Sequence, residues 1–215
     1  MTNWVLLRAA GMGAYLMLFL AVAWGLVATT SVVTKRISKQ SSNLFHQFVA
    51  TTGLALLVVH MLLLVIDDFM PFAPLDLLVP MRSGYRPVSI ALGIVAMYAT
   101  VVIVVTSWLR KPIGTKLWRA IHLLAVPSFA LTLGHGVFAG TDTNRLWMFA
   151  MYAVTGLAVL FLVVVRSLTH GYRPPRPERP ERPAKRAERA ARPVAADQVP
   201  ASMSPSTIRK MPPRA

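Results

Sequence analysis

Long runs without charged side chains constrain this fold more than any other feature of the sequence. Five of them are long enough to cross about 30 Å of hydrocarbon as helices. We expect these helices at about 11–33, 44–66, 88–109, 117–138 and 146–165. Lipid offers backbone N–H and C=O groups no partner, so spanning segments of this kind are helical. We therefore predict an all-α fold, a polytopic membrane helical bundle of about five transmembrane helices over residues 1–168.

The absence of cysteine narrows the chemistry that the chain can carry. Disulfides, iron–sulfur clusters and thiolate metal ligands are excluded, and so is covalent haem attachment through C-x-x-C-H. Any haem in this chain would be b-type, held by coordination alone.

Carboxylates are missing from all five predicted spans. The glutamates lie in the C-terminal tail, and the aspartates lie in predicted loops or in the tail. Histidine is therefore the ionisable residue of the span interiors, where such residues are costly and usually functional. Four of the five histidines lie there: His46, His60, His122 and His135.

His46 and His60 share one face of the span 44–66. They are 14 residues apart, which leaves them within about 40° of each other on a helix, with Gly53 midway between them. A bulky group would fit over this glycine. A single histidine in a membrane helix more often makes a helix-to-helix hydrogen bond than it binds a ligand. A second pair of histidines is needed to argue for a ligand site.

The span 117–138 supplies that second pair. It runs parallel to 44–66, because one span separates them, and His122 lies near the same end as His46. The histidines are about 21 Å apart along one helix and about 19.5 Å along the other. The four histidines therefore lie at two depths in the membrane, which we call levels, and each level has two facing histidines. On a straight helix, His122 and His135 would point about 140° apart; a kink or local unwinding at Pro127 would correct this.

A haem iron held by two neutral imidazoles needs one histidine from each of two facing helices at one depth. Two such levels predict two haem b groups, one in each leaflet. Gly134 and Gly136 flank His135 and would allow a flat ring, or another helix, to approach closely.

Basic residues orient the predicted bundle. The segments 35–44 and 110–119 carry three and four Lys or Arg, more than the other two connecting segments. The positive-inside rule places both in the cytoplasm, so the N-terminus lies outside and the C-terminus inside. We expect a multi-pass protein of the plasma membrane, in contact with lipid.

The tail, 169–215, is rich in Pro, Arg and Ala and carries eleven Lys or Arg after His170. It has little apolar surface to bury, so we expect disorder. It is either a solvated cytoplasmic extension or a segment attracted to anionic lipid. Nucleic acid is not an expected partner, because almost no aromatic residues lie between the arginines.

Other chemistry fits the sequence less well. H-x3-H and H-E-x-x-H are absent, and no Ser, His, Asp order has usable spacing. A proton-coupled transporter would usually carry a carboxylate within the membrane. No nucleotide-binding motif is present.

The spacing H-x13-H on one span and H-x12-H two spans later resembles the ferric reductase-like transmembrane domain family. This family includes the membrane parts of ferric reductases and NADPH oxidases, and the resemblance covers about 4–166. Loop residues are similar to those of short actinobacterial members: Val79-Pro80, Tyr85-Arg86-Pro87, Trp118-Arg119-Ala120-Ile121-His122 and Gly140-Thr-Asp-Thr143.

This resemblance implies that His46 pairs with His122 on an inner haem and His60 with His135 on an outer one. It also implies that electrons cross the membrane. The chain lacks the flavin and NADPH domains of the reductase and oxidase members, so we expect a flavoprotein or a quinol as electron donor. Haem-propionate partners are expected among Arg119 and Lys116 inside, and Arg82 or Arg86 outside, although membrane orientation explains these residues equally well.

The leading hypothesis is thus a b-type cytochrome that carries electrons across the membrane. Two alternatives stay open. One is a haem-containing scaffold or anchor subunit whose tail recruits a redox partner. The other is a proton-coupled transporter that uses the histidines as a relay.

Overall fold

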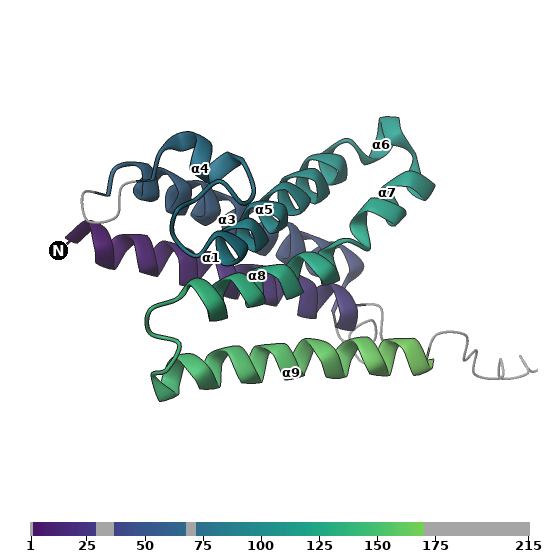
Figure 1. The fold of residues 1–215 in the computed structure, drawn as a ribbon. Coiled ribbons are helices and arrows are strands. Elements are labelled where there is room, and N and C mark those ends of the chain that lie inside the picture. Colours follow the sequence, from purple (N-terminus) through teal and green to yellow (C-terminus); the bar gives the residue numbers. More distant parts are fainter. Residues whose placement is uncertain (1, 29–36, 68–71, 170–215) are drawn as a thin grey trace, which may run out of the picture. The chain divides into compact units, whose positions relative to one another are not determined.

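The structure is a computed structural model that describes residues 2–28, 37–67 and 72–169. Over these residues it contains eight helices and no strand (Figure 1). The chain divides into two units, Met1–His170 and Gly171–Ala215, and only the first falls among the described residues. The predicted disordered tail and the last five residues of the predicted helix 11–33 therefore lie outside the described residues.

Five helical segments are long and apolar enough to cross a membrane, which confirms the predicted all-α fold class. Four of them are the single helices α1 (Thr2–Val27), α3 (Lys39–Val65), α5 (Pro87–Trp108) and α9 (Leu146–Thr169). The remaining span consists of α7 (Thr115–His122) followed by α8 (Ala125–Ala139).

Two spans begin earlier than their apolar runs suggest. α1 begins nine residues before the predicted start at Gly11 and so includes Arg8, whose charge is paired with Asp142. α3 begins at Lys39 because the Ser38 hydroxyl accepts a hydrogen bond from the Ser41 N–H, at 3.0 Å. Such a cap satisfies one of the free N–H groups at a helix start. Polar residues can therefore extend a span beyond its apolar part.

Two short helices lie in the connections between spans. α4 (Pro74–Leu78) falls in the segment 69–87, where we expected a loop with a short turn. α6 (Arg110–Ile113) joins α5 to α7, and Gly114 between α6 and α7 has a φ of 82°. This left-handed backbone conformation favours glycine.

The spans associate as two close helix pairs. α1 packs along α3, and α5 packs along α8, whereas α3 has far fewer contacts with α5. The α5–α8 contact contains the buried Ser128, whose hydroxyl donates to the Ala96 carbonyl at 3.2 Å and lies 3.1 Å from that of Thr100. Small residues and hydrogen bonds of this kind are typical of helix contacts in membranes.

The span 115–139 is interrupted at Leu123 and Leu124, directly after His122. Pro127 has no N–H to donate to the carbonyl four residues before it, that of Leu123, and its ring would crowd that carbonyl. The Leu124 N–H instead donates to the Ile121 carbonyl, at 3.0 Å, in a tighter turn. The interruption expected near Pro127 is therefore present one turn before it, between His122 and His135.

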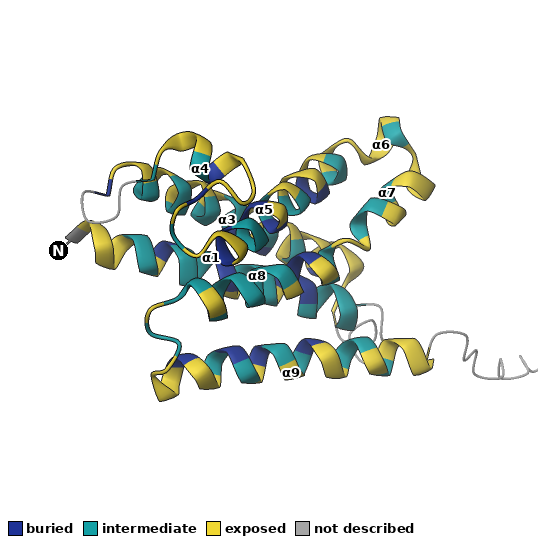
Figure 2. Ribbon diagram, in the orientation of Figure 1, coloured by how far each residue is buried: buried dark blue, intermediate teal, exposed yellow. Residues whose placement is uncertain are grey.

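α9 packs against α1 and α8. A buried cluster joins the three helices and contains Tyr15, Val22, Phe129, Met148, Tyr152 and Val159. The Tyr15 and Thr155 hydroxyls share a hydrogen bond, and the Tyr15 ring packs edge-on against Tyr152 at 5.2 Å. The buried residues of α9 recur along one side, and exposed apolar residues cover the rest of the helix (Figure 2). That exposed surface suits contact with lipid.

Gly53 lies at the α1–α3 contact as well as on the histidine face of α3. A Cβ added to it would lie 3.0 Å from the Met17 Cβ and 3.7 Å from the Leu18 backbone N. The glycine is buried and lets the two helices approach closely.

Gly53→Leu should therefore separate α1 from α3. We expect a loss of about 1–3 kcal/mol, as is common for overpacking, measured as a lower thermal unfolding temperature in detergent by tryptophan fluorescence. Gly84→Leu is the matched control, because a Cβ at Gly84 meets no atom within 4 Å. Equal unfolding temperatures for the two variants would contradict this role of Gly53.

Candidate functional site

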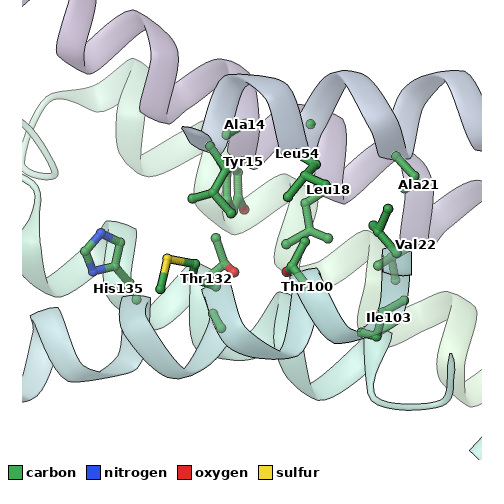
Figure 3. Close-up of a pocket in the computed structure, with 18 of the residues that line it drawn as sticks. Ala14, Tyr15, Leu18, Ala21, Val22, Leu54, Thr100, Ile103, Thr132 and His135 are labelled. Atoms are coloured by element: carbon green, nitrogen blue, oxygen red, sulfur yellow. The ribbon is translucent and has the colours of Figure 1, made fainter. Parts of the chain in front are cut away.

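A cavity of about 1100 Å³ lies between the two helix pairs. Its walls come from all five spans, and all four histidines of the spans are among the residues that line it. Figure 3 shows side chains of α1, α3, α5 and α8 around it, among them Tyr15, Leu54, Thr100 and His135. The cavity is at the upper end of the roughly 300–1,000 Å³ that small-molecule sites occupy. It has room for a bulky ligand.

The structure brings His46 and His122 together at one end of the cavity. Their ring centroids are 5.9 Å apart, with an angle of 66° between the ring planes. A metal ion held between two imidazole nitrogens at about 2 Å each would place the ring centres about 6 Å apart. The observed separation therefore suits two ligands on opposite sides of one metal ion.

His122 is held by stacking. Its ring lies against Trp118, with centroids 5.0 Å apart and planes 29° from parallel. The Trp118 N–H donates to the Ser107 hydroxyl at 3.1 Å, and the Arg110 guanidinium lies 4.2 Å from the Trp118 ring centroid. The Nδ1 atom of His122 is buried and has no hydrogen-bond partner among the described residues. The Trp118 ring therefore takes the orienting role that a hydrogen bond usually plays.

His60 and His135 both line the other end of the cavity. Each is hydrogen-bonded to the neighbouring helix of its own pair. His60 Nδ1 lies 3.0 Å from the Leu7 carbonyl of α1, and His135 Nδ1 lies 2.8 Å from the Ser89 carbonyl of α5. A carbonyl only accepts, so Nδ1 carries the proton in both rings. The Nε2 lone pair is left for a metal ion, as in most histidine–metal sites.

Glycines on the neighbouring helix make room for three of these rings. A Cβ added at Gly11 would lie 3.0 Å from the His60 ring, and one at Gly93 would lie 2.7 Å from His135 Nδ1. A Cβ at Gly25 would lie 3.5 Å from His46, an ordinary contact distance. Sequence reasoning missed these residues, yet Gly11 and Gly25 are 14 residues apart, as are His46 and His60. In antiparallel neighbouring spans, this equal spacing is the signal that could have found them.

Cationic side chains lie at both ends of the cavity, but they are only partly those expected. Arg119 lines it, and Lys116 does not. Arg82 and Arg86 do not line it either: Arg82 pairs with Asp76 at 3.0 Å, and Arg86 donates to the Phe138 carbonyl at 2.5 Å. The cations that do line the cavity are Arg8, Arg110, Arg119 and Arg166. At the His60–His135 end, the arginine that lines the cavity is Arg8, and neither Arg82 nor Arg86 lines it.

These residues fit a metal ion whose remaining ligands belong to a bound cofactor. No group of three or more His, Cys, Asp or Glu side chains occurs in the described part of the chain, so the protein offers its histidines two at a time. A haem would take its protein ligands from these histidines, His46 with His122 and His60 with His135, and would supply one-electron redox chemistry there. The unpartnered Nδ1 of His122 and the glycines beside His60 and His135 agree with such a cofactor.

Gly93→Ala should displace the His135 ring, because the new Cβ would lie 2.7 Å from Nδ1 and break the contact with the Ser89 carbonyl. If the chain holds one haem at each histidine pair, the purified variant should retain about half the haem of the wild type, measured by pyridine haemochrome per mole of protein. Gly25→Ala is the matched control, since its Cβ would meet His46 at an ordinary distance. Equal haem content in both variants would show that the Gly93 contact does not position His135.

Trp118→Leu should release His122 from its stacked position. If His46 and His122 hold a haem, its low-spin ferric signal in electron paramagnetic resonance should change, because this signal depends on the relative orientation of the two imidazole planes. Trp118→Phe keeps a ring for stacking and should change the signal less. Trp147→Leu, at an exposed residue outside the cavity, is the control. A Trp118→Leu spectrum identical to that of the wild type would contradict the orienting role.

One family model matches the chain. Its description is ferric reductase like transmembrane component, and it matches residues 10–133, more than half of the chain. The matched region includes His46, His60 and His122 and ends two residues before His135. No curated protein and no solved structure matches the chain.

Proposed function

Since the chain belongs to the ferric reductase like transmembrane component family, we propose that it is a b-type cytochrome subunit that carries electrons across a membrane through two haems. The family indicates a membrane redox or electron-transfer domain, and its members generally bind haem. With five apolar spans, the chain is a multi-pass membrane protein in contact with lipid. The two-haem pathway is our proposal.

The observation that carries this proposal is the arrangement of the four histidines around one cavity. The ring centroids of His46 and His122 are 5.9 Å apart, and His60 and His135 both line the other end of the same cavity. In our proposal, each pair supplies the two axial ligands of one haem. A bound haem accepts and releases one electron at its iron. The protein holds the ligands, excludes water from the cavity and sets the reduction potential through ligand anchoring, burial and nearby charge.

The histidines of both levels lie on the same two spans, α3 and the span formed by α7 and α8. This arrangement would allow electron transfer across the membrane. Fourteen residues separate the histidines of α3, which is about 21 Å along a helix and most of the hydrocarbon thickness. We propose that the His46–His122 level lies on the cytoplasmic side, because it is next to the basic segment that contains Arg110, Lys111, Lys116 and Arg119. The N-terminus would then be outside and the C-terminus in the cytoplasm.

The electron donor in this proposal is a separate molecule, a flavoprotein or a quinol. In this proposal the chain takes electrons from this partner at one haem and delivers them from the other. The basic tail, which lies outside the described residues, is one candidate contact for a protein partner.

Single histidine substitutions test the two-level arrangement. His60→Ala and His135→Ala should each remove about half of the haem, and so should His46→Ala and His122→Ala, because a haem with one axial ligand missing is held weakly. The measurement is haem per mole of purified protein together with the reduced-minus-oxidised spectrum. His170→Ala is the matched control, since His170 belongs to neither pair.

The outcomes separate the open alternatives. A wild-type chain that purifies without haem from haem-replete cells would exclude the cytochrome and favour a histidine relay in a transporter. Bound haem that neither a quinol nor a reduced flavoprotein can reduce would favour a scaffold subunit. Loss of all haem, or of none, on replacing His60 would contradict two independent levels.

A further inference from the structure

We propose that Arg8 binds a propionate carboxylate of the haem at the His60–His135 level, and that Asp142 positions Arg8 for this contact. The inference rests on the proposed function, because it needs a haem at that level. It assigns a binding role to a residue of α1. It also gives a role to the segment Gly140–Thr143, whose residues are similar to those of short actinobacterial members of the family.

Arg8 lies at the His60–His135 end of the cavity. The preceding residue, Leu7, has its carbonyl 3.0 Å from His60 Nδ1. The Arg8 side chain is 21% exposed and is among the residues that line the cavity. Its guanidinium lies 4.1 Å from the Trp4 ring centroid. A cation in this half-buried position next to an apolar span is costly unless it has anionic partners.

The other arginines suggested for this end are engaged elsewhere. Arg82 is paired with Asp76, and Arg86 donates to the Phe138 carbonyl. Neither lines the cavity, and the remaining arginines that do line it lie towards the other end. Arg110 contacts Trp118 next to His122, and Arg166 donates to the Leu26 carbonyl at the end of α1. Among the described residues that line the cavity, Arg8 is therefore the cation at the His60–His135 end.

Asp142 reaches Arg8 because the segment after α8 folds back on itself. The Thr143 hydroxyl donates to the Val137 carbonyl at 2.9 Å, near the last turn of α8. Gly140 fits tightly against this turn, because a Cβ there would lie 2.6 Å from the Gly136 carbonyl oxygen. Asp142 is thereby held within ion-pairing distance of Arg8. The sequence Gly140-Thr-Asp-Thr143 thus serves to place one carboxylate.

One arginine can bind both the Asp142 carboxylate and a haem propionate. A guanidinium has five N–H donors in a planar fork, and a single carboxylate uses at most two of them. Asp142 would hold one edge of the fork and leave the other for the ligand. A lysine would not substitute well, because its ammonium group is a point charge on a flexible stem.

The two charges predict reduction-potential shifts of opposite sign. Arg8 disfavours the more positive ferric state, so Arg8→Gln should lower the potential of the haem at this level. Asp142 favours the ferric state, so Asp142→Asn should raise it. We expect each shift to reach up to about tenfold in the one-electron equilibrium, which corresponds to about 59 mV.

The test is a potentiometric titration of the full-length chain in detergent, followed by its visible spectrum. Arg8→Gln and Asp142→Asn are compared in the wild type and in a His122→Ala background, which should keep only the haem at the His60–His135 level. Arg8→Lys keeps the charge and should leave the potential near that of the wild type while weakening haem retention. Arg82→Gln is the control and should leave the potential unchanged.

Failure of this inference can be told apart from failure of the proposed function. If the Arg8–Asp142 pair only ties α1 to the segment after α8, both variants should lower stability and haem content alike, and no pair of opposite shifts should appear. Equal or absent shifts in a chain that retains two haems would overturn the role of Arg8 alone. A wild-type chain without haem would overturn the proposed function first.

Discussion

The hydrogen bonds that hold His60 and His135 determine how this bundle can be built. An imidazole in an apolar span needs a partner for its N–H, and no carboxylate is available inside the spans. Both rings donate to a backbone carbonyl of the neighbouring helix, Leu7 in α1 and Ser89 in α5. A helix carbonyl can be reached only where the helices are very close, and Gly11 and Gly93 allow that approach. Close packing within each helix pair therefore allows one histidine of that pair to be anchored by a backbone carbonyl.

The pairs leave a cavity between them because each is packed mainly within itself. α1 lies along α3 and α5 lies along α8, while the aromatic cluster around Tyr15, Phe129 and Tyr152 fixes the distance between the pairs on one side. The interruption after His122 turns its ring towards His46, although 13 residues on a straight helix would point it away. Anchoring thus differs between the levels: backbone carbonyls hold His60 and His135, whereas Trp118 stacking holds His122.

The membrane spans and the positions of their histidines could be predicted from the sequence, because both are patterns within single helices. The five segments, the facing positions of His46 and His122, and the interruption near Pro127 follow from periodicity and from proline chemistry. The two haem levels stay a prediction. The roles of Gly53, Gly11 and Gly93 depend on which helix lies opposite, which one sequence does not state. Arg8 was missed for a related reason: its charge suggested a residue outside the span, and its partner Asp142 is 134 residues away. The same limit explains why Arg82 and Arg86 were suggested in its place.

The central claim is that each histidine pair holds one haem, and it can be tested on the unmodified chain. The most direct measurement is the haem-to-protein ratio of the purified full-length protein, combined with electron paramagnetic resonance of its ferric state. The account predicts two b haems per chain, both low-spin as expected for two histidine ligands. One haem per chain, or a high-spin signal from an iron with an open position, would contradict it.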